Sequence, residues 1–151
     1  MRRDSRLSVA LHVLLHMQEH GEAVSSEALA EQMDMNAVVL RRTMAGLRDA
    51  GIVRSEKGHG GGWALVRSLA EITLADVYAA LGEPELFAIG ARVESPGCRV
   101  EQAVDRALEG ALAEAQALVA ARLASITLAD VAKDVRDRGG IRRKKAAHSH
   151  A

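Results

Sequence analysis

The sequence contains few cysteine, proline and aromatic residues. Its 151 residues include one Cys, two Pro, one Trp, one Tyr and one Phe. A single cysteine cannot form an internal disulfide framework, which argues against a disulfide-stabilised secreted domain and favours a reducing compartment. Long apolar runs are missing as well: no stretch reaches the ~20 apolar residues of a membrane-spanning helix, and no signal-peptide cleavage pattern follows the first apolar segment. We therefore expect a cytoplasmic protein that does not bind membranes.

The remaining composition is typical of a folded protein. Hydrophobic residues make up 48% and charged residues 26% of the chain, proportions that exclude disorder throughout. The net charge is zero, but the charges are unevenly distributed. Residues 34–67 carry six basic and three acidic side chains, residues 68–134 carry five and eleven, and residues 135–151 carry six and one. Two basic blocks therefore flank an acidic middle, a distribution that leaves nucleic-acid binding open.

The first part of the chain predicts a winged helix-turn-helix. Apolar periodicity and end signals predict three helices, over residues 4–20, 26–33 and 36–50. The residues that mark the buried side of the third helix are Val39, Leu40, Met44 and Leu47. Gly51 then stands where a left-handed C-cap is needed. Two strand-like runs, residues 52–55 and 63–66, enclose the glycine-rich loop 56–62 and predict a β-hairpin.

A nine-residue repeat marks the second part of the chain. Residues 69–77 return as residues 123–131 with eight of nine residues identical. In each copy a threonine, Thr73 or Thr127, can cap a helix whose third residue is an aspartate. We interpret the repeat as one local helix start used twice and not as a duplicated domain.

A long alanine-rich helix is predicted over residues 100–124. At ~1.5 Å per residue it would span roughly 38 Å, which is long for so small a domain. Its apolar stripe needs a partner surface, and a second copy of the same helix is the simplest one. The residues expected in this dimer interface are Val104, Leu108, Ala111, Leu112, Ala115, Leu118 and Val119.

Together these segments predict a mainly α fold with a small β-hairpin, organised in three parts. Residues 1–67 would form the winged helix-turn-helix domain. Residues 68–134 would supply a connecting helix, a loop and the dimerisation helix. Residues 135–151, with their basic and histidine-containing composition, would form a flexible basic tail.

The third helix and the hairpin carry the candidate DNA contacts. In a helix-turn-helix the second helix of the motif enters the major groove by its N-terminal residues, and arginines there read guanine edges or hold phosphates. Cations in the hairpin loop can lie along phosphates or the minor groove. The candidate residues are Asn36, Val38, Arg41, Arg42, Arg54, Lys57, Gly58, His59 and Gly60. A nucleotide-binding loop is disfavoured, because such a loop ends in Gly-Lys-Ser/Thr and runs into a helix, whereas this one runs into a strand.

Three segments resemble one protein family. Residues 47–55, 58–65 and 72–77 follow the patterns L-R-x-A-G-[IL]-V, G-x-G-G-G-[WYF]-x-L and I-T-L-x-[DE]-V. This combination is similar to the Rrf2 family of bacterial winged-helix regulators, and the likeness extends over residues 4–134. The resemblance implies a homodimeric DNA-binding transcription regulator, here expected to be a repressor, that acts on a near-palindromic operator. The alternative from another class is a protein-interaction module that keeps the winged helix but binds no DNA.

The resemblance also raises the question of an iron–sulfur cluster. Cluster-binding members of the family place three cysteines before the dimerisation helix, but here Cys98 is alone and Arg92 and Val104 occupy the flanking positions. A cluster normally requires four ligands, mostly thiolates, so we expect no cluster and no other cofactor. Cys98 precedes Arg99 and a helix start, surroundings typical of reactive cysteines. It serves either as a thiol sensor or as a small packed residue.

Metal binding and enzymatic activity receive little support. His12, His16 and His20 recur at four-residue spacing, and two histidines so spaced can bind a transition metal. No cysteine or carboxylate is identifiable that would complete the ligand set, so no metal site is expected and a partly buried or DNA-facing surface is favoured. No Ser-His-Asp order, nucleophile elbow or carboxylate pair stands out, which argues against an enzyme.

Overall fold

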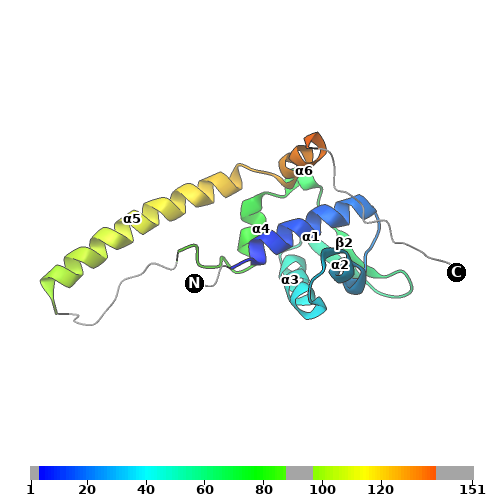
Figure 1. Cartoon of the computed structure of the whole chain (residues 1–151), viewed down its shortest axis with the longest axis horizontal. Coiled ribbons are helices and arrows are strands. Elements are labelled where there is room, and N and C mark those ends of the chain that lie inside the picture. Colours follow the sequence, from blue (N-terminus) through cyan, green and yellow to red (C-terminus); the bar gives the residue numbers. More distant parts are fainter. Residues whose placement is uncertain (1–3, 88–96, 139–151) are drawn as a thin grey trace.

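One long helix projects from the rest of the molecule (Figure 1). The computed structural model describes residues 4–87 and 97–138. The elements in chain order are α1 (Arg6–His20), α2 (Ser26–Met33), α3 (Ala37–Asp49), β1 (Val53–Glu56), β2 (Gly62–Leu65), the short 3₁₀ helix η1 (Leu69–Glu71), α4 (Leu74–Ala80), α5 (Arg99–Ala124) and α6 (Leu128–Asp137). This is the predicted mainly α fold with one antiparallel hairpin.

The caps that the sequence predicts for the second and third helices are present. Ser25 Oγ accepts a hydrogen bond from the Ala28 N–H at 3.1 Å, and Asn36 Oδ1 accepts one from the Val38 N–H at 2.8 Å. Gly51 has a φ of +71°, the left-handed conformation that ends a helix without a Cβ clash. The predicted bounds of these helices therefore differ from the observed bounds by two residues or fewer.

The two predicted strands are each displaced by one residue. β1 begins at Val53 because the N–H of Ile52 donates to the Leu47 carbonyl at 3.0 Å, which makes Ile52 part of the end of α3. β2 begins at Gly62, which pairs with Glu56 across the hairpin.

Aliphatic side chains form one core around α1, which contacts α2, α3, α4, α6 and β2. The largest fully buried members are Leu14, Leu29, Leu40, Met44, Leu47, Ile52, Ile72 and Leu128. Each such side chain contributes about 1.5–3 kcal/mol when it leaves water. The core therefore fixes α3 and the hairpin in one orientation relative to α1.

Val24 adds a short third pairing to the hairpin. Its N–H donates to the Trp63 carbonyl at 3.0 Å, its carbonyl accepts from the Trp63 N–H at 2.8 Å, and Trp63 Nε1 donates to Ser26 Oγ at 2.8 Å. Gly62 permits this contact, because a Cβ at that position would lie 2.4 Å from the Val24 carbonyl carbon. These bonds attach the hairpin, through Trp63 of β2, to the start of α2.

Gly62→Ala is expected to lower the free energy of unfolding by roughly 1–3 kcal/mol, because the new Cβ meets backbone that cannot move aside. Gly58→Ala is the matched control, since Gly58 also has a positive φ but has open space around it. Both variants place a Cβ at a positive φ, so the difference between their urea unfolding midpoints reports the collision with Val24 alone. Equal midpoints for the two variants would contradict the close approach.

The two copies of the sequence repeat pair with each other. The Leu74 N–H donates to the Ile126 carbonyl, and the Leu128 N–H donates to the Ile72 carbonyl, both at 2.9 Å. Each copy also forms the predicted capping box, in which the threonine and the aspartate three residues later exchange hydrogen bonds. The local helix starts are therefore confirmed, and their contact attaches the segment after α5 to the base of α4.

α6 continues beyond the predicted start of the basic tail. The tail was expected from residue 135, but the helix runs to Asp137. Val135 is half-buried and, with Leu15, Leu69 and Ala132, lines an apolar hollow of about 260 Å³ between α1 and α6. Val135 extends the helix because it belongs to this apolar face. The rest of the predicted tail lies outside the described residues.

α5 has 26 residues and no buried side chain among them. It begins one residue earlier than predicted and packs against α4. Among the predicted interface residues, Val104, Leu108 and Leu118 are 51%, 36% and 73% exposed, and Ala111 is also exposed. The half-buried members, Leu112, Ala115 and Val119, lie toward one edge of the same stripe. Most of the stripe is therefore uncovered within this chain.

Candidate nucleic-acid interface

The N-terminal end of α3 presents two apolar side chains to the outside. Val38 is 58% exposed and Val39 is 49% exposed, whereas Leu40 is fully buried. The prediction that Val39 lies on the buried side of this helix is therefore wrong. Leu40 and Met44 pack into the core, and Val39, in the first turn of the helix, is exposed. Apolar side chains at this end of a recognition helix can contact thymine methyl groups.

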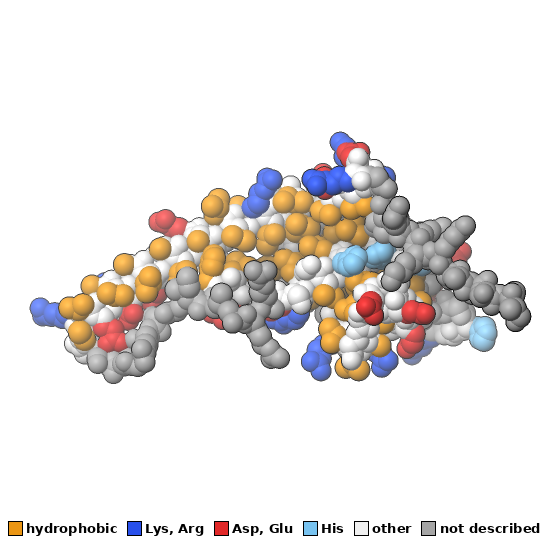
Figure 2. Space-filling view, in the orientation of Figure 1, with side chains coloured by type: hydrophobic (Ala, Val, Ile, Leu, Met, Phe, Trp, Pro, Cys, Tyr) orange, Lys and Arg blue, Asp and Glu red, His pale blue; other side chains and the backbone are white. Residues whose placement is uncertain are grey.

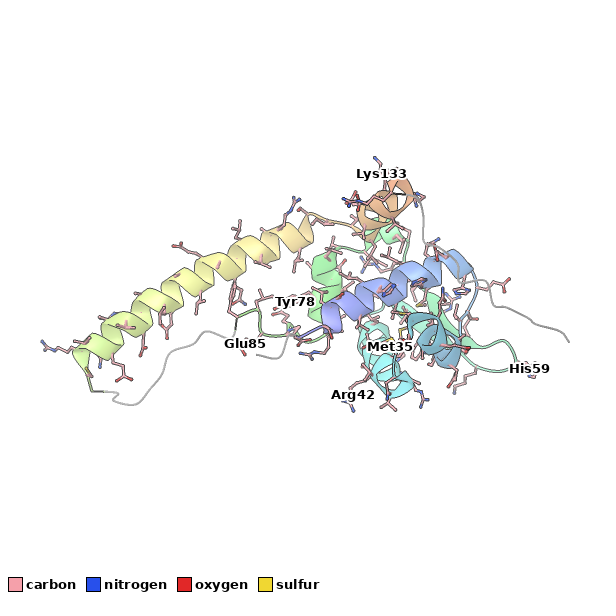
Figure 3. The ribbon with its side chains drawn as sticks, in the orientation of Figure 1. Met35, Arg42, His59, Tyr78, Glu85 and Lys133 are labelled. Atoms are coloured by element: carbon pink, nitrogen blue, oxygen red, sulfur yellow. The ribbon has the colours of Figure 1, made fainter. Side chains whose placement is uncertain are left out.

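Arg41 and Arg42 have different electrostatic surroundings. Arg41 Nη2 lies 3.6 Å from Glu27 Oε1 of α2, and because both side chains are mostly exposed this ion pair is weak. Arg42 extends outward from the end of α3 (Figure 3). Within the described part of the chain, no carboxylate lies within ion-pair distance of Arg42. Arg42 therefore offers the less compensated charge.

Arg6, which the sequence analysis did not single out, lies close to Arg42. Both line a hollow of about 250 Å³ between α1, α3 and α4. Arg6 Nη2 donates to Asp4 Oδ2 at 2.6 Å, and the hydrogen bonds from Arg6 lower the pKa of the Asp4 carboxyl. This proximity comes from the packing of α1 on α3, so no local sequence signal could have revealed it.

The hairpin of β1 and β2, with the glycine-rich loop between them, forms the wing of the fold. It extends from the body with His59 near its tip (Figure 3). Gly58 and Gly60 have φ values of +99° and +76°, and the Gly61 N–H closes the turn on the Gly58 carbonyl at 3.0 Å. Lys57 is exposed and lies at the start of this loop. The loop therefore carries a cation on backbone that can approach a surface closely.

Among the described residues, Arg54 is the wing candidate that has an ion-pair partner. Its Nη2 lies 2.8 Å from Glu56 Oε1 on the same strand. A phosphate would have to compete with this carboxylate. Lys57 has no such ion pair among the described residues.

Charge on the visible face separates α3 from α2. Basic and apolar side chains share the lower edge of the molecule over α3, while carboxylates gather beside them over α2 (Figure 2). The acidic side chains on α2 are Glu27 and Glu31, and both are exposed. Because these carboxylates repel phosphate, the electrostatics favour an approach through the end of α3 and the wing.

The structure groups the predicted site residues in two places. Asn36, Val38, Arg41 and Arg42 lie at one end of α3, and Arg54, Lys57, Gly58, His59 and Gly60 lie on the wing. All are exposed. Among the described residues, no helix is both long enough and apolar enough to cross a lipid bilayer.

Comparison with known proteins identifies the family. The Rrf2 family model, described as an iron-dependent transcriptional regulator, matches residues 3–134. YwnA of Bacillus subtilis (strain 168), whose name assigns it to the HTH-type transcriptional regulators, is 36% identical over 129 residues, which cover 85% of this chain and 95% of YwnA.

Two solved structures share the fold. IscR of T. potens superposes with a TM-score of 0.70 at 22% identity, covering 94% of this chain and 93% of IscR. CymR, described as the global cysteine regulator of B. subtilis, superposes with a TM-score of 0.63 at 23% identity, covering 89% of this chain and 98% of CymR.

The family description mentions iron, and an iron site would require suitable ligand atoms in this chain. Cys98, at the N-cap of α5, is exposed and is the one cysteine in the sequence. One thiolate per chain does not fit an iron–sulfur cluster, which normally takes four ligands. The described residues also contain no group of three or more His, Cys, Asp or Glu side chains placed to hold a metal ion.

Extensive sequence similarity, the shared fold and the exposed α3 and wing lead to one conclusion. This chain belongs to the Rrf2 family, whose members are DNA-binding transcription regulators and not enzymes.

Proposed function

We propose that this regulator acts as a homodimeric repressor, in the bacterial cytoplasm, on a near-palindromic operator. The observation that carries the proposal is α5, which projects from the body with its apolar stripe uncovered. Val100 and Leu118 are each more than two-thirds exposed on this helix. Exposed apolar stripes of this kind favour association, and a two-fold axis lets each copy cover the other.

The length of α5 suits the spacing of two half-sites on DNA. At ~1.5 Å per residue, a helix of 26 residues spans about 39 Å. Half-sites one turn of DNA apart are separated by about 34–36 Å. Two α5 helices packed side by side would therefore hold two α3 helices at a separation suited to successive major grooves.

Within each half-site, we assign different roles to α3 and the wing. Arg42 would read a guanine edge or hold a phosphate, and Val38 and Val39 would contact thymine methyl groups. Lys57 and His59 would lie along the backbone or the adjacent minor groove. Asn36 caps α3 and so keeps this end of the helix in place.

Selection of bound duplexes from a random library, followed by binding measurements at several salt concentrations, tests the proposal. We expect a near-palindromic sequence, two chains per duplex, and an affinity that falls steeply with salt because phosphate contacts release counterions. Protein added to an in vitro transcription reaction should lower the output of a promoter that overlaps this operator. Absence of salt-dependent DNA binding would favour a protein-interaction module.

The proposal includes a thiol response through Cys98. Its side chain is exposed at the N-terminus of α5, so an adduct there could tilt the two DNA-binding domains. Alkylation by a maleimide, in which the sulfur bonds to the maleimide carbon and the thiol proton passes through solvent to the neighbouring carbon, is expected to weaken operator binding. Cys98→Ser should abolish the effect. Unchanged operator affinity after complete alkylation, verified by mass spectrometry, would rule out a regulatory role for Cys98.

A further inference from the structure

The histidine stripe of α1 forms an ordered cluster whose function the DNA-binding site does not explain. His12 Nε2 and His16 Nε2 lie 2.9 Å apart, and the two ring centroids are separated by 4.7 Å with planes tilted by 44°. Histidine side chains form a patch between α1 and α2 on the face shown in Figure 2. The two Nε2 atoms therefore converge on one point next to the protein surface.

His16 is held in place from its other ring nitrogen. Gln32 Nε2 of α2 donates to His16 Nδ1 at 2.9 Å, and Glu19 Oε2 lies 3.4 Å from the same nitrogen. Gln32 Oε1 accepts a hydrogen bond from His20 Nε2 at 2.9 Å. His16 is only 6% exposed, whereas His12 is exposed and leaves the cluster open to ions in solution.

We propose that His12 and His16 bind a divalent late transition-metal ion, Ni²⁺ or Cu²⁺, through their Nε2 atoms. A metal ion about 2.0–2.1 Å from each nitrogen would subtend an angle of about 90° across the observed 2.9 Å separation. That angle matches the square-planar or tetragonal geometry of Cu²⁺ and Ni²⁺. A tetrahedral Zn²⁺ site would need the nitrogens about 3.3 Å apart.

The side chains around His16 Nδ1 can hold the tautomer that binds a metal through Nε2. Metal-bound histidines donate their other N–H to a carboxylate or carbonyl oxygen, which fixes the tautomer and the ring orientation. Glu19 Oε2 lies 3.4 Å from that nitrogen as an acceptor, whereas the Gln32 atom that faces it is Nε2, a donor. When the metal replaces the proton shared by the two Nε2 atoms, that proton moves through solvent to Nδ1. Rotation of the Gln32 amide then presents its oxygen as the acceptor.

Titration with Ni²⁺ and with Cu²⁺, followed by calorimetry, tests the site. His148 and His150 form a second histidine pair in the tail, so the full-length chain with both replaced by alanine serves as the parent protein. We expect one ion per chain. Electron paramagnetic resonance of the Cu²⁺ form should show nitrogen ligands.

Single variants of this parent then assign the ligands. His12→Ala should weaken binding at least tenfold, and because His12 is exposed the fold should be retained. Gln32→Ala should weaken it about tenfold through loss of the group that orients His16. His20→Ala is the matched control, since His20 belongs to the same stripe and contacts Gln32 but not the Nε2 pair. Binding within twofold of the parent is expected.

Two results would overturn the proposal. One is a parent protein with no saturable uptake of either ion, which would leave the His12–His16 contact as an N–H···N hydrogen bond. The other is an affinity in His12→Ala equal to that in His20→Ala. DNA binding does not enter these measurements, so the outcome is independent of the proposed operator and dimer.

Discussion

Leu118→Glu is expected to convert the proposed dimer into monomers and to reduce operator affinity at least about a hundredfold. Leu118 is 73% exposed in the single chain, so it makes little contribution to the stability of the monomer. In a two-fold interface the substitution would bury two carboxylates without partners. Leaving a buried charge unpaired costs about 3–5 kcal/mol, and 1.4 kcal/mol corresponds to tenfold in an equilibrium constant.

The choice of residue decides what this experiment measures. Leu112 and Val119 were predicted in the same interface, but they are already half-buried within the chain. Charges there would disturb packing against the chain's own body as well as association. Leu118 and Val104 belong to the uncovered part of the stripe and report on association alone.

Ala113→Glu is the matched control for Leu118→Glu. Ala113 is exposed and lies on the side of α5 away from the stripe, so the same charge is added to the same helix outside the expected interface. Light scattering at micromolar concentration should give a dimer for the wild type and the control and a monomer for Leu118→Glu. A dimer in all three proteins would contradict the assignment of this stripe.

Features set by neighbouring residues were predictable from the sequence. The capping boxes at Thr73 and Thr127 require side chains three residues apart, and both form as predicted. The N-cap at Asn36 and the left-handed Gly51 likewise depend on local backbone geometry. These short-range rules place the start of α3 and the start of the hairpin, which carry the candidate DNA contacts.

Features set by contacts between distant segments were not predictable. The pairing of Thr73 with Thr127 joins residues on either side of α5, and no periodicity indicates it. The exposure of Val39 depends on which turn of α3 faces α1. The ion pair between Arg41 and Glu27 depends on the angle at which α2 meets α3. Sequence reasoning therefore found the right segments and could not rank the side chains within them.

The ion pairs of the structure distinguish the candidate cations by whether a carboxylate compensates their charge. Arg41 and Arg54 each face a glutamate, at 3.6 and 2.8 Å, whereas no carboxylate within the described part of the chain pairs with Arg42 or Lys57. Arg42→Ala combined with Lys57→Ala is therefore expected to weaken operator binding about a hundredfold, since the proposed dimer would lose a base contact of about 1–3 kcal/mol and a phosphate contact at each of its two half-sites.

The two single variants should differ in which duplexes they bind less tightly. Lys57→Ala should weaken binding to operator and random duplexes alike, and it should reduce the salt slope by about one because one phosphate contact is lost. Arg42→Ala should cost more on the operator than on random DNA, because a base contact carries sequence information and a phosphate contact does not. Fluorescence anisotropy with both duplexes, at several salt concentrations, measures both quantities.

Arg48→Ala provides the control for the loss of one positive charge from α3. Arg48 lies in the last turn of the helix, at the end away from Asn36, and its Nη2 is 3.1 Å from Asp49 Oδ1. Because Arg48 has an ion-pair partner and lies far from the end of α3 that we propose enters the groove, its replacement should change operator affinity by less than about threefold, within the range of an exposed ion pair. If Arg42→Ala lost no more operator affinity than Arg48→Ala, the N-terminal end of α3 would not enter the major groove, and the wing alone would remain as the contact surface.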